Sequence, residues 1–208
     1  MNLSQQQKKM LKKGVERANE LFKKGQFKVF KNWRNHEKTL DQIKKEHGSF
    51  KDACADLNKW YRTRVNCDFW SERLEAFMRE KKGLPQQSWV KEAIEYAGEK
   101  NRRSFLSKFF HFFVAPEVFP IYDKFAKAAV VRILKEKVKD AISYTDFCRK
   151  IDEISEALGN KYSYRELDHF FWMAGYYWPQ LYAKDWQEVF NDSDFAALKE
   201  ILDEWLKL

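Results

Sequence analysis

The stretch RRSFLSKFFHFFVAPEVFPIYDKFAKAAV, Arg102 to Val130, combines a basic start, an aromatic segment, two prolines and two acidic residues, Glu117 between the prolines and Asp123 after them. Proline interrupts a helix because it lacks a backbone N–H and its ring clashes with the preceding turn. Asp123 follows the second proline at the head of another apolar segment, where aspartate is a preferred N-cap. The stretch therefore predicts a helix, a rigid turn between Pro116 and Pro120, and a second helix that begins at Asp123.

Helical spacing of apolar residues continues along the rest of the chain. Only 7 glycines and 4 prolines interrupt 208 residues, and no alternating strand pattern of useful length is present. A basic aromatic connector is expected near residues 27–38. Helices are expected at about 3–24, 39–47, 49–61, 69–83, 88–97, 102–113, 123–139, from 143, 163–175 and from 192. The sequence predicts an all-α fold of roughly ten helices.

Positive charge is concentrated near the N-terminus. Residues 1–66 hold 17 Lys and Arg against 7 Asp and Glu, whereas residues 67–208 hold 22 against 24. Such a segment favours a polyanionic partner, usually DNA or RNA, over a merely solvated basic surface. Two regions are expected, a basic helical region at 1–83 and a second region at 84–208, forming one compact unit with two lobes.

Several classes of protein do not fit the sequence. Cys54, Cys67 and Cys148 are scattered, so neither a disulfide framework nor a zinc or iron–sulfur spacing is present. No second ligand stands three or four residues from His111, and we expect neither metal nor cofactor. No apolar run is long enough for a bilayer, and the start has no signal region. A cytoplasmic monomer is expected.

A predicted hairpin with basic residues precedes Asp123 in the sequence. The segment GEKN separates two predicted helices, and Lys100, Asn101, Arg102 and Arg103 follow its glycine. Backbone N–H groups of a tight hairpin beside such cations can hold a DNA phosphate. Asp123 comes about twenty residues later at a helix N-terminus, where the dipole and N–H groups stabilise a negative charge.

This order resembles the helix-hairpin-helix DNA glycosylases, in particular the 8-oxoguanine glycosylase branch. VFPIYDKF looks like the segment that delivers the catalytic aspartate, and YRELDHFFWMAGYYWP, residues 164–179, looks like a later helix of small bacterial proteins of this fold. The resemblance covers roughly residues 88–179. It implies a bundle with a central cleft, double-stranded DNA with a flipped base as partner, and excision of a damaged or modified base. Defence against phages with modified DNA is the setting that we expect for such a small protein.

The resemblance places Asp123 as the catalytic carboxylate, and a helix cap is its alternative role. Lys100 fits a phosphate contact better than a nucleophile. Lys108 is the better candidate for a covalent lysine, with a surface lysine as the alternative. Further contacts to nucleic acid are expected from Lys124, Lys28, Lys31 and Arg34.

A flipped base is usually held between aromatic or apolar faces. The expected walls of a base pocket are Tyr122, His111, Trp172, Tyr176 and Tyr177, and Tyr176, Tyr177 and Trp178 are expected on an exposed rim. Most of the chain's aromatic residues must instead form the core.

Two alternatives to an enzyme stay open. The hairpin has a single glycine, Gly98, and Tyr122 stands directly before the aspartate where the family has glycine or proline. Both departures favour a nucleic-acid-binding protein of the same fold without chemistry. A helical interaction protein, with its basic N-terminus on an acidic partner, is the third hypothesis.

Overall fold

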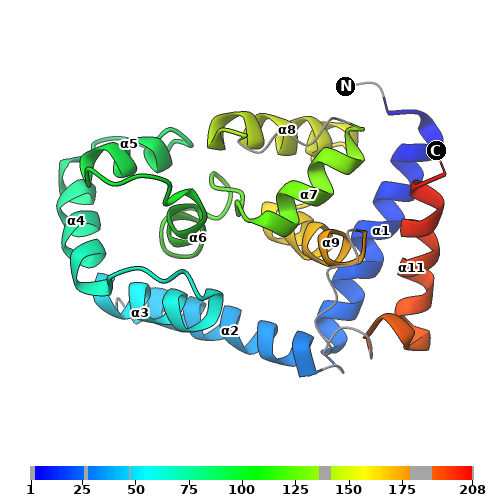
Figure 1. Cartoon of the computed structure of the whole chain (residues 1–208), viewed down its shortest axis with the longest axis horizontal. Coiled ribbons are helices and arrows are strands. Elements are labelled where there is room, and N and C mark those ends of the chain that lie inside the picture. The colour runs from blue at the N-terminus through cyan, green and yellow to red at the C-terminus, as the bar shows by residue number, and fades with distance from the viewer. Residues whose placement is uncertain (1–2, 26–27, 47, 136–141, 179–188, 208) are drawn as a thin grey trace. The chain divides into compact units, whose positions relative to one another are not determined.

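The computed structural model describes residues 3–25, 28–46, 48–135, 142–178 and 189–207. Every regular element within them is a helix, which confirms the all-α class with roughly ten helices. None of these helices is long and apolar enough to cross a bilayer. The helices in Figure 1 are α1 (Gln5–Lys24), α2 (Lys28–Lys45), α3 (Phe50–Tyr61), α4 (Cys67–Glu80), α5 (Trp89–Tyr96), α6 (Arg103–Phe113), α7 (Lys124–Ile133), α8 (Tyr144–Ala157), α9 (Tyr164–Tyr177) and α11 (Ser193–Trp205).

Local capping determines where several helices begin and end. At the start of α3 the Ser49 hydroxyl accepts from the Asp52 N–H, and the Asp52 carboxylate accepts from the Ser49 N–H. Ser163 and Glu166 form the same capping box at the start of α9. Gly25 ends α1 in a left-handed conformation with φ of 57°. These ends agree with those predicted from the sequence.

The expected connector at residues 27–38 is wrong, because α2 runs without a break from Lys28 to Lys45. Its buried residues include Phe30, Trp33 and Leu40, which are three and seven positions apart. That spacing places them on one face of a helix. Lysine and arginine residues stand between these apolar residues in the sequence, so their helical spacing is difficult to recognise there.

The chain divides into two compact units that are interleaved in sequence. Unit 1 comprises residues 1–35, 123–142 and 149–208, and unit 2 comprises residues 36–122 and 143–148. The expected division at residue 83 is based on charge and on the resemblance, whereas the two units are defined by contacts in space. The division at residue 83 therefore stays a prediction.

Unit 1 is built around α9, which packs against α1 and α7, while α1 also packs against α11. Two glycines allow these close approaches. Gly14 of α1 faces the ring of Phe170, and Gly175 of α9 faces the backbone of Phe125 at the start of α7. A Cβ atom at Gly175 would lie 2.1 Å from the Phe125 carbonyl oxygen. Only glycine therefore fits where α9 meets α7.

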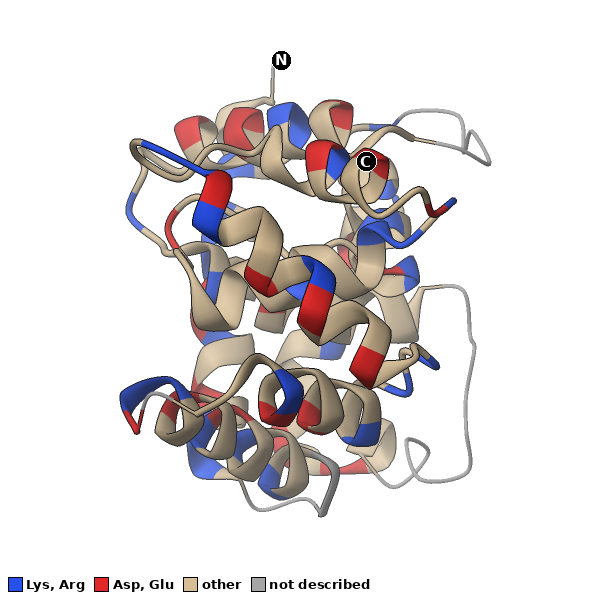
Figure 2. Ribbon diagram, turned by 90° about the vertical axis from the view of Figure 1, so that its left-hand side faces the viewer, with Lys and Arg blue, Asp and Glu red and all other residues tan. Residues whose placement is uncertain are grey.

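Unit 2 packs α3 and α5 against α6, with α4 against α3 and α5. Residues 105–112 of α6 are all buried, so this helix is the centre of the unit. Trp70 and Phe77 of α4 contribute aromatic contacts to Phe105 and Phe110 of α6. Acidic and basic residues are mixed along α4, as Figure 2 shows, so this helix presents no strongly basic surface.

Candidate functional site

The turn between α6 and α7 is held from within unit 2 by a buried histidine. His111 of α6 is fully buried, and its Nδ1 lies 2.8 Å from the carbonyl oxygen of Phe119. Because a carbonyl oxygen only accepts hydrogen bonds, Nδ1 must carry the proton and donate. His111 therefore positions the turn, and its predicted contact to a base stays a prediction.

Two more buried side chains hold the same turn. The Tyr144 hydroxyl donates to the Pro120 carbonyl at 3.0 Å, and the Ser107 hydroxyl accepts from the Tyr122 N–H at 3.0 Å. Proline has no backbone N–H, so the backbone of Pro120 can accept a hydrogen bond through its carbonyl oxygen but cannot donate one. Together with His111, these contacts give the backbone at 119–122 a defined course directly before Asp123.

Asp123 is the N-cap of α7 in unit 1, as predicted. It is half-buried and extended, with φ of −140° and ψ of 179°. Its Oδ1 accepts from the N–H groups of Phe125 and Ala126, both at 2.9 Å. One carboxylate oxygen therefore receives both hydrogen bonds, which fixes the orientation of the group.

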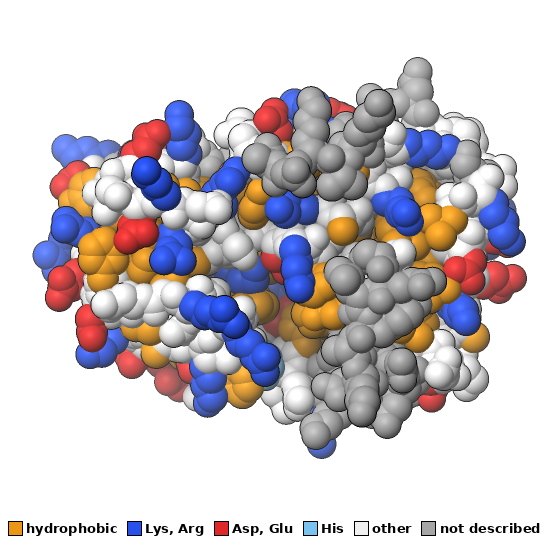
Figure 3. Space-filling model, viewed as in Figure 1, with side chains coloured by type: hydrophobic (Ala, Val, Ile, Leu, Met, Phe, Trp, Pro, Cys, Tyr) orange, Lys and Arg blue, Asp and Glu red, His pale blue; other side chains and the backbone are white. Residues whose placement is uncertain are grey.

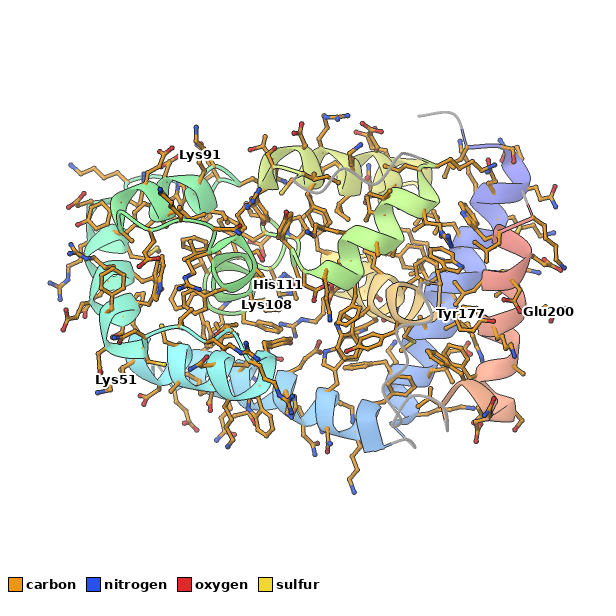
Figure 4. The ribbon with its side chains drawn as sticks, in the orientation of Figure 1. Lys51, Lys91, Lys108, His111, Tyr177 and Glu200 are labelled. Carbon is orange, nitrogen blue, oxygen red and sulfur yellow. The ribbon has the colours of Figure 1, made fainter. Side chains whose placement is uncertain are left out.

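Lys108 of α6 is buried, with 3% of its surface exposed, so the surface-lysine alternative is wrong. Its Nζ donates to the Ser104 hydroxyl at 3.0 Å and lies 5.2 Å from the centre of the Tyr61 ring. A fully buried lysine is rare because desolvation of the ammonium group costs free energy. Figure 4 shows Lys108 and His111 projecting from the same helix.

The hairpin between α5 and α6 keeps its basic residues near the surface. Gly98 and Asn101 adopt left-handed backbones with φ of 66° and 65°. Lys100 is exposed, whereas Arg102 is half-buried and its Nε lies 3.7 Å from Glu99. The described contacts include no side-chain cap for α6. The start of α6 therefore offers backbone amides beside a cationic side chain.

Arg103 connects this hairpin to the turn before α7. Its guanidinium donates to the Asn101 side chain at 3.0 Å and lies 5.5 Å from the centre of the Tyr122 ring. Tyr122 is 5% exposed and packs edge-on against Tyr144 and Phe147. The ring of Tyr122 therefore belongs to the core of unit 2, and its role in a base pocket stays a prediction.

Unit 1 gathers aromatic residues beside the start of α7. The Phe125 ring stacks on Tyr176 with centroids 3.6 Å apart, and Trp172 meets the Tyr176 ring at 4.7 Å. Trp33 of α2 lies 4.3 Å from Trp172. The exposed Lys124 has its Nζ 4.6 Å from the centre of the Phe125 ring. Trp172 and Tyr176 are half-buried, so the cluster lies at the edge of the core of unit 1.

Tyr177 lies on a different face of α9, and its predicted place on an exposed rim is wrong. The same prediction is wrong for Trp178, which is 7% exposed and donates through Nε1 to the Leu202 carbonyl. Tyr177 is 9% exposed, and its hydroxyl donates to Asp203 of α11 at 2.6 Å. Its ring packs against Phe190 and Phe195. Figure 4 shows it between α9 and α11. Neighbouring residues on a helix point about 100° apart, which separates Tyr177 from Tyr176.

The basic N-terminal residues do not share one role. Lys31 is exposed, whereas the Arg34 guanidinium donates to the Lys23 carbonyl at 2.6 Å and packs over Gly25. Arg34 thus provides a hydrogen-bond donor for a carbonyl group in the last turn of α1. The side chain of Lys28 lies outside the described residues. On the face of the protein drawn in Figure 3, Lys and Arg side chains lie among hydrophobic and acidic side chains.

Sequence reasoning did not identify Ser107, Tyr144 and Phe125 as parts of this region. Ser107 and His111 are four residues apart, so both lie on one face of α6, and this spacing was available as a signal. Tyr144 is 21 residues beyond Asp123, and nothing in the sequence connects it with Pro120. Among the described residues, no three His, Cys, Asp or Glu side chains are placed to share a metal ion.

No protein-family model matches the chain, and no curated protein and no solved structure matches it. The helix-hairpin-helix resemblance and the central cleft stay predictions based on the residues quoted above.

Proposed function

We propose that the chain is a DNA glycosylase that hydrolyses the N-glycosidic bond of a flipped damaged or modified base and leaves an abasic site. The main support is the Asp123 carboxylate, which two backbone amides orient at the start of α7. Both amides belong to unit 1, as Asp123 does, so the orientation of the carboxylate is fixed within its own unit. A carboxylate with a fixed orientation favours a chemical role in addition to capping.

The proposed reaction requires little covalent machinery. As the N-glycosidic bond breaks, its electron pair leaves with the base and positive charge develops on the deoxyribose, as in sugar hydrolysis. Asp123 stabilises that charge and accepts a proton from the water whose oxygen bonds to C1′. The departing base takes up a proton, and the products are a free base and an abasic sugar.

Lys108 supports a covalent variant of the same reaction. In this variant the neutral amine attacks C1′, the base leaves, and the sugar ring opens to a Schiff base between Nζ and C1′. Lys108 is 3% exposed, and its Nζ lies beside the Tyr61 ring and the Ser104 hydroxyl, so its amine is held away from bulk water. Borohydride reduces a Schiff base to a stable amine, so a covalent protein–DNA adduct that Lys108→Gln loses distinguishes the variant from direct hydrolysis.

DNA contacts in this proposal come from two sources. Lys100 and the amides at the start of α6 hold a backbone phosphate. Trp172 and Tyr176 supply aromatic faces on which an unstacked base can lie. Such binding weakens strongly with added salt.

The test is base release from DNA that contains a panel of damaged and modified bases, followed by alkali cleavage of abasic sites. We expect scission with the wild-type chain and none with Asp123→Asn, since asparagine keeps the cap and removes the negative charge. Asp192 is a matched control, because it caps α11 through a bond to the Asp194 N–H at 2.7 Å. Asp192→Asn should retain activity. Equal scission by wild type and Asp123→Asn across the panel contradicts the proposal.

A non-catalytic nucleic-acid-binding protein is the second candidate. It is favoured by the burial of the Tyr122 ring, which directly precedes Asp123, in the core of unit 2. In that case, reversing the charges of Lys100, Arg102 and Arg103 abolishes the DNA mobility shift. Asp123→Asn would then leave the shift unchanged, and no base would be released by any variant.

A further inference from the structure

Unit 2 contains a pocket of about 420 Å³ that the proposed function does not use. It lies among the end of α2, the start of α3, α4 and the end of α6. This volume is within the range of small-molecule sites. Residues that line it include Ile43, Lys44, Phe50, Met78, Phe109 and Phe113.

The walls of the pocket are apolar and braced by aromatic contacts. The Phe50 ring stacks against Phe109 with centroids 5.6 Å apart, and Phe109 lies 5.5 Å from Phe113. Phe109 is 1% exposed, while Phe50, Phe113 and Met78 are half-buried. Rings fixed in this way give a largely formed surface for an apolar ligand.

Lys44 is the only ionisable side chain among the described residues that line the pocket. It is exposed, and its Nζ lies 3.4 Å from the Val114 carbonyl oxygen at the end of α6. This long hydrogen bond places the ammonium group close to the end of α6 that lines the pocket. Val114 is itself a lining residue, so the cation adjoins the apolar wall.

We propose that this pocket binds an amphipathic carboxylate, such as a medium-chain fatty acid. The apolar chain lies against Phe50, Phe109 and Phe113, and the carboxylate pairs with Lys44. One cation beside an otherwise apolar lining matches a ligand with one negative charge and a long hydrocarbon body. The proposal does not depend on the glycosylase reaction, because none of the residues assigned to that chemistry lines the pocket.

The probe is dodecanoate, titrated below its aggregation concentration into the full chain labelled with ¹³C at the methionine methyl groups. Binding should shift the Met78 signal saturably. Met10 and Met173 are buried in unit 1 and are internal controls that should not move. Dodecan-1-ol, which has the same chain and no charge, should bind about tenfold more weakly.

Lys44→Glu should weaken dodecanoate binding at least tenfold and leave dodecan-1-ol binding unchanged. Lys45→Glu is the matched control, because Lys45 is the exposed neighbour that does not line the pocket and should retain binding. The proposal is overturned if Met78 does not shift, if all methionines shift together, or if the alcohol binds as tightly as the acid. Equal binding by Lys44→Glu and Lys45→Glu also overturns it.

Discussion

Asp123 combines a capping role with the proposed chemical role, and the choice of replacement separates them. Asp123→Ala removes both hydrogen bonds to the amides of α7 and should lower the free energy of unfolding by about 1 kcal/mol. Asp123→Asn retains an acceptor oxygen and should stay close to wild type. Denaturant unfolding measures both values. A loss for Asp123→Asn as large as that for Asp123→Ala would show that the negative charge stabilises the fold.

His36 should make stability depend on pH. Its ring stacks on Trp60 with centroids 3.5 Å apart, and burial, with a smaller effect of Lys59, lowers its pKa below 6.5. Glu37 opposes this shift. The unfolded chain therefore binds a proton more readily than the folded chain. The contribution of His36 is fully present above pH 6.5 and is lost as the pH falls below that value.

The comparison that isolates His36 is the unfolding free energy of wild type and His36→Phe between pH 7.5 and pH 5.5. Phenylalanine preserves the ring stack and cannot titrate. The wild type should lose more stability than His36→Phe on acidification, since the other histidines contribute equally to both. Parallel pH profiles would show that the His36 ring titrates alike in folded and unfolded chains.

The contact between α7 and α9 depends on one position without a side chain. Gly175→Ala places a Cβ atom within 2.1 Å of the Phe125 carbonyl oxygen, which is backbone and cannot rotate away. The two helices must separate, and we expect a loss of about 3 kcal/mol in unfolding free energy. Gly98→Ala is the comparison, since its Cβ meets open space and only the left-handed backbone opposes it. It should cost about 1 kcal/mol.

Helix ends were predicted well where side chains cap their own backbone. Ser49, Ser163 and Asp192 are read directly from the sequence because each cap involves residues at most three positions away. The course of α2 was missed because its apolar stripe is narrow and its surface is densely charged. Capping residues close in sequence thus predict where a helix begins or ends, but they do not predict that a helix such as α2 continues through a basic segment.

The candidate site was predicted only where its residues are neighbours in sequence. Asp123 as a cap follows from the proline turn and the periodic segment after it. Lys108 contacts the ring of Tyr61 of α3, and the Pro120 carbonyl in the turn accepts from Tyr144 of α8. Contacts over such separations follow from the packing of whole helices, which periodicity alone does not determine.

The interleaving of the two units predicts how fragments of the chain behave. Fragment 84–208 lacks α1, whose Leu11, Val15 and Leu21 are almost fully buried in unit 1. Each such side chain contributes about 1.5–3 kcal/mol on burial. The same fragment lacks α3 and α4 of unit 2. Neither 1–83 nor 84–208 should therefore fold alone.

Amide NMR spectra test this expectation. Each fragment alone should give poorly dispersed signals, and an equimolar mixture should recover part of the dispersion of the intact chain. A well-dispersed spectrum from 84–208 alone would instead support an autonomous domain that begins near residue 84.

The close approach at Gly175 also limits how this sequence can drift over evolution. Any substitution there must be accompanied by a compensating shift of α7, so the position should remain glycine in descendants that have lost most other identities. Gly83, Gly98 and Gly159 have open space around them and left-handed backbones, which asparagine tolerates. A distant relative should therefore be recognisable by an invariant glycine near the C-terminal end of its aromatic helix, even after its surface glycines have been replaced.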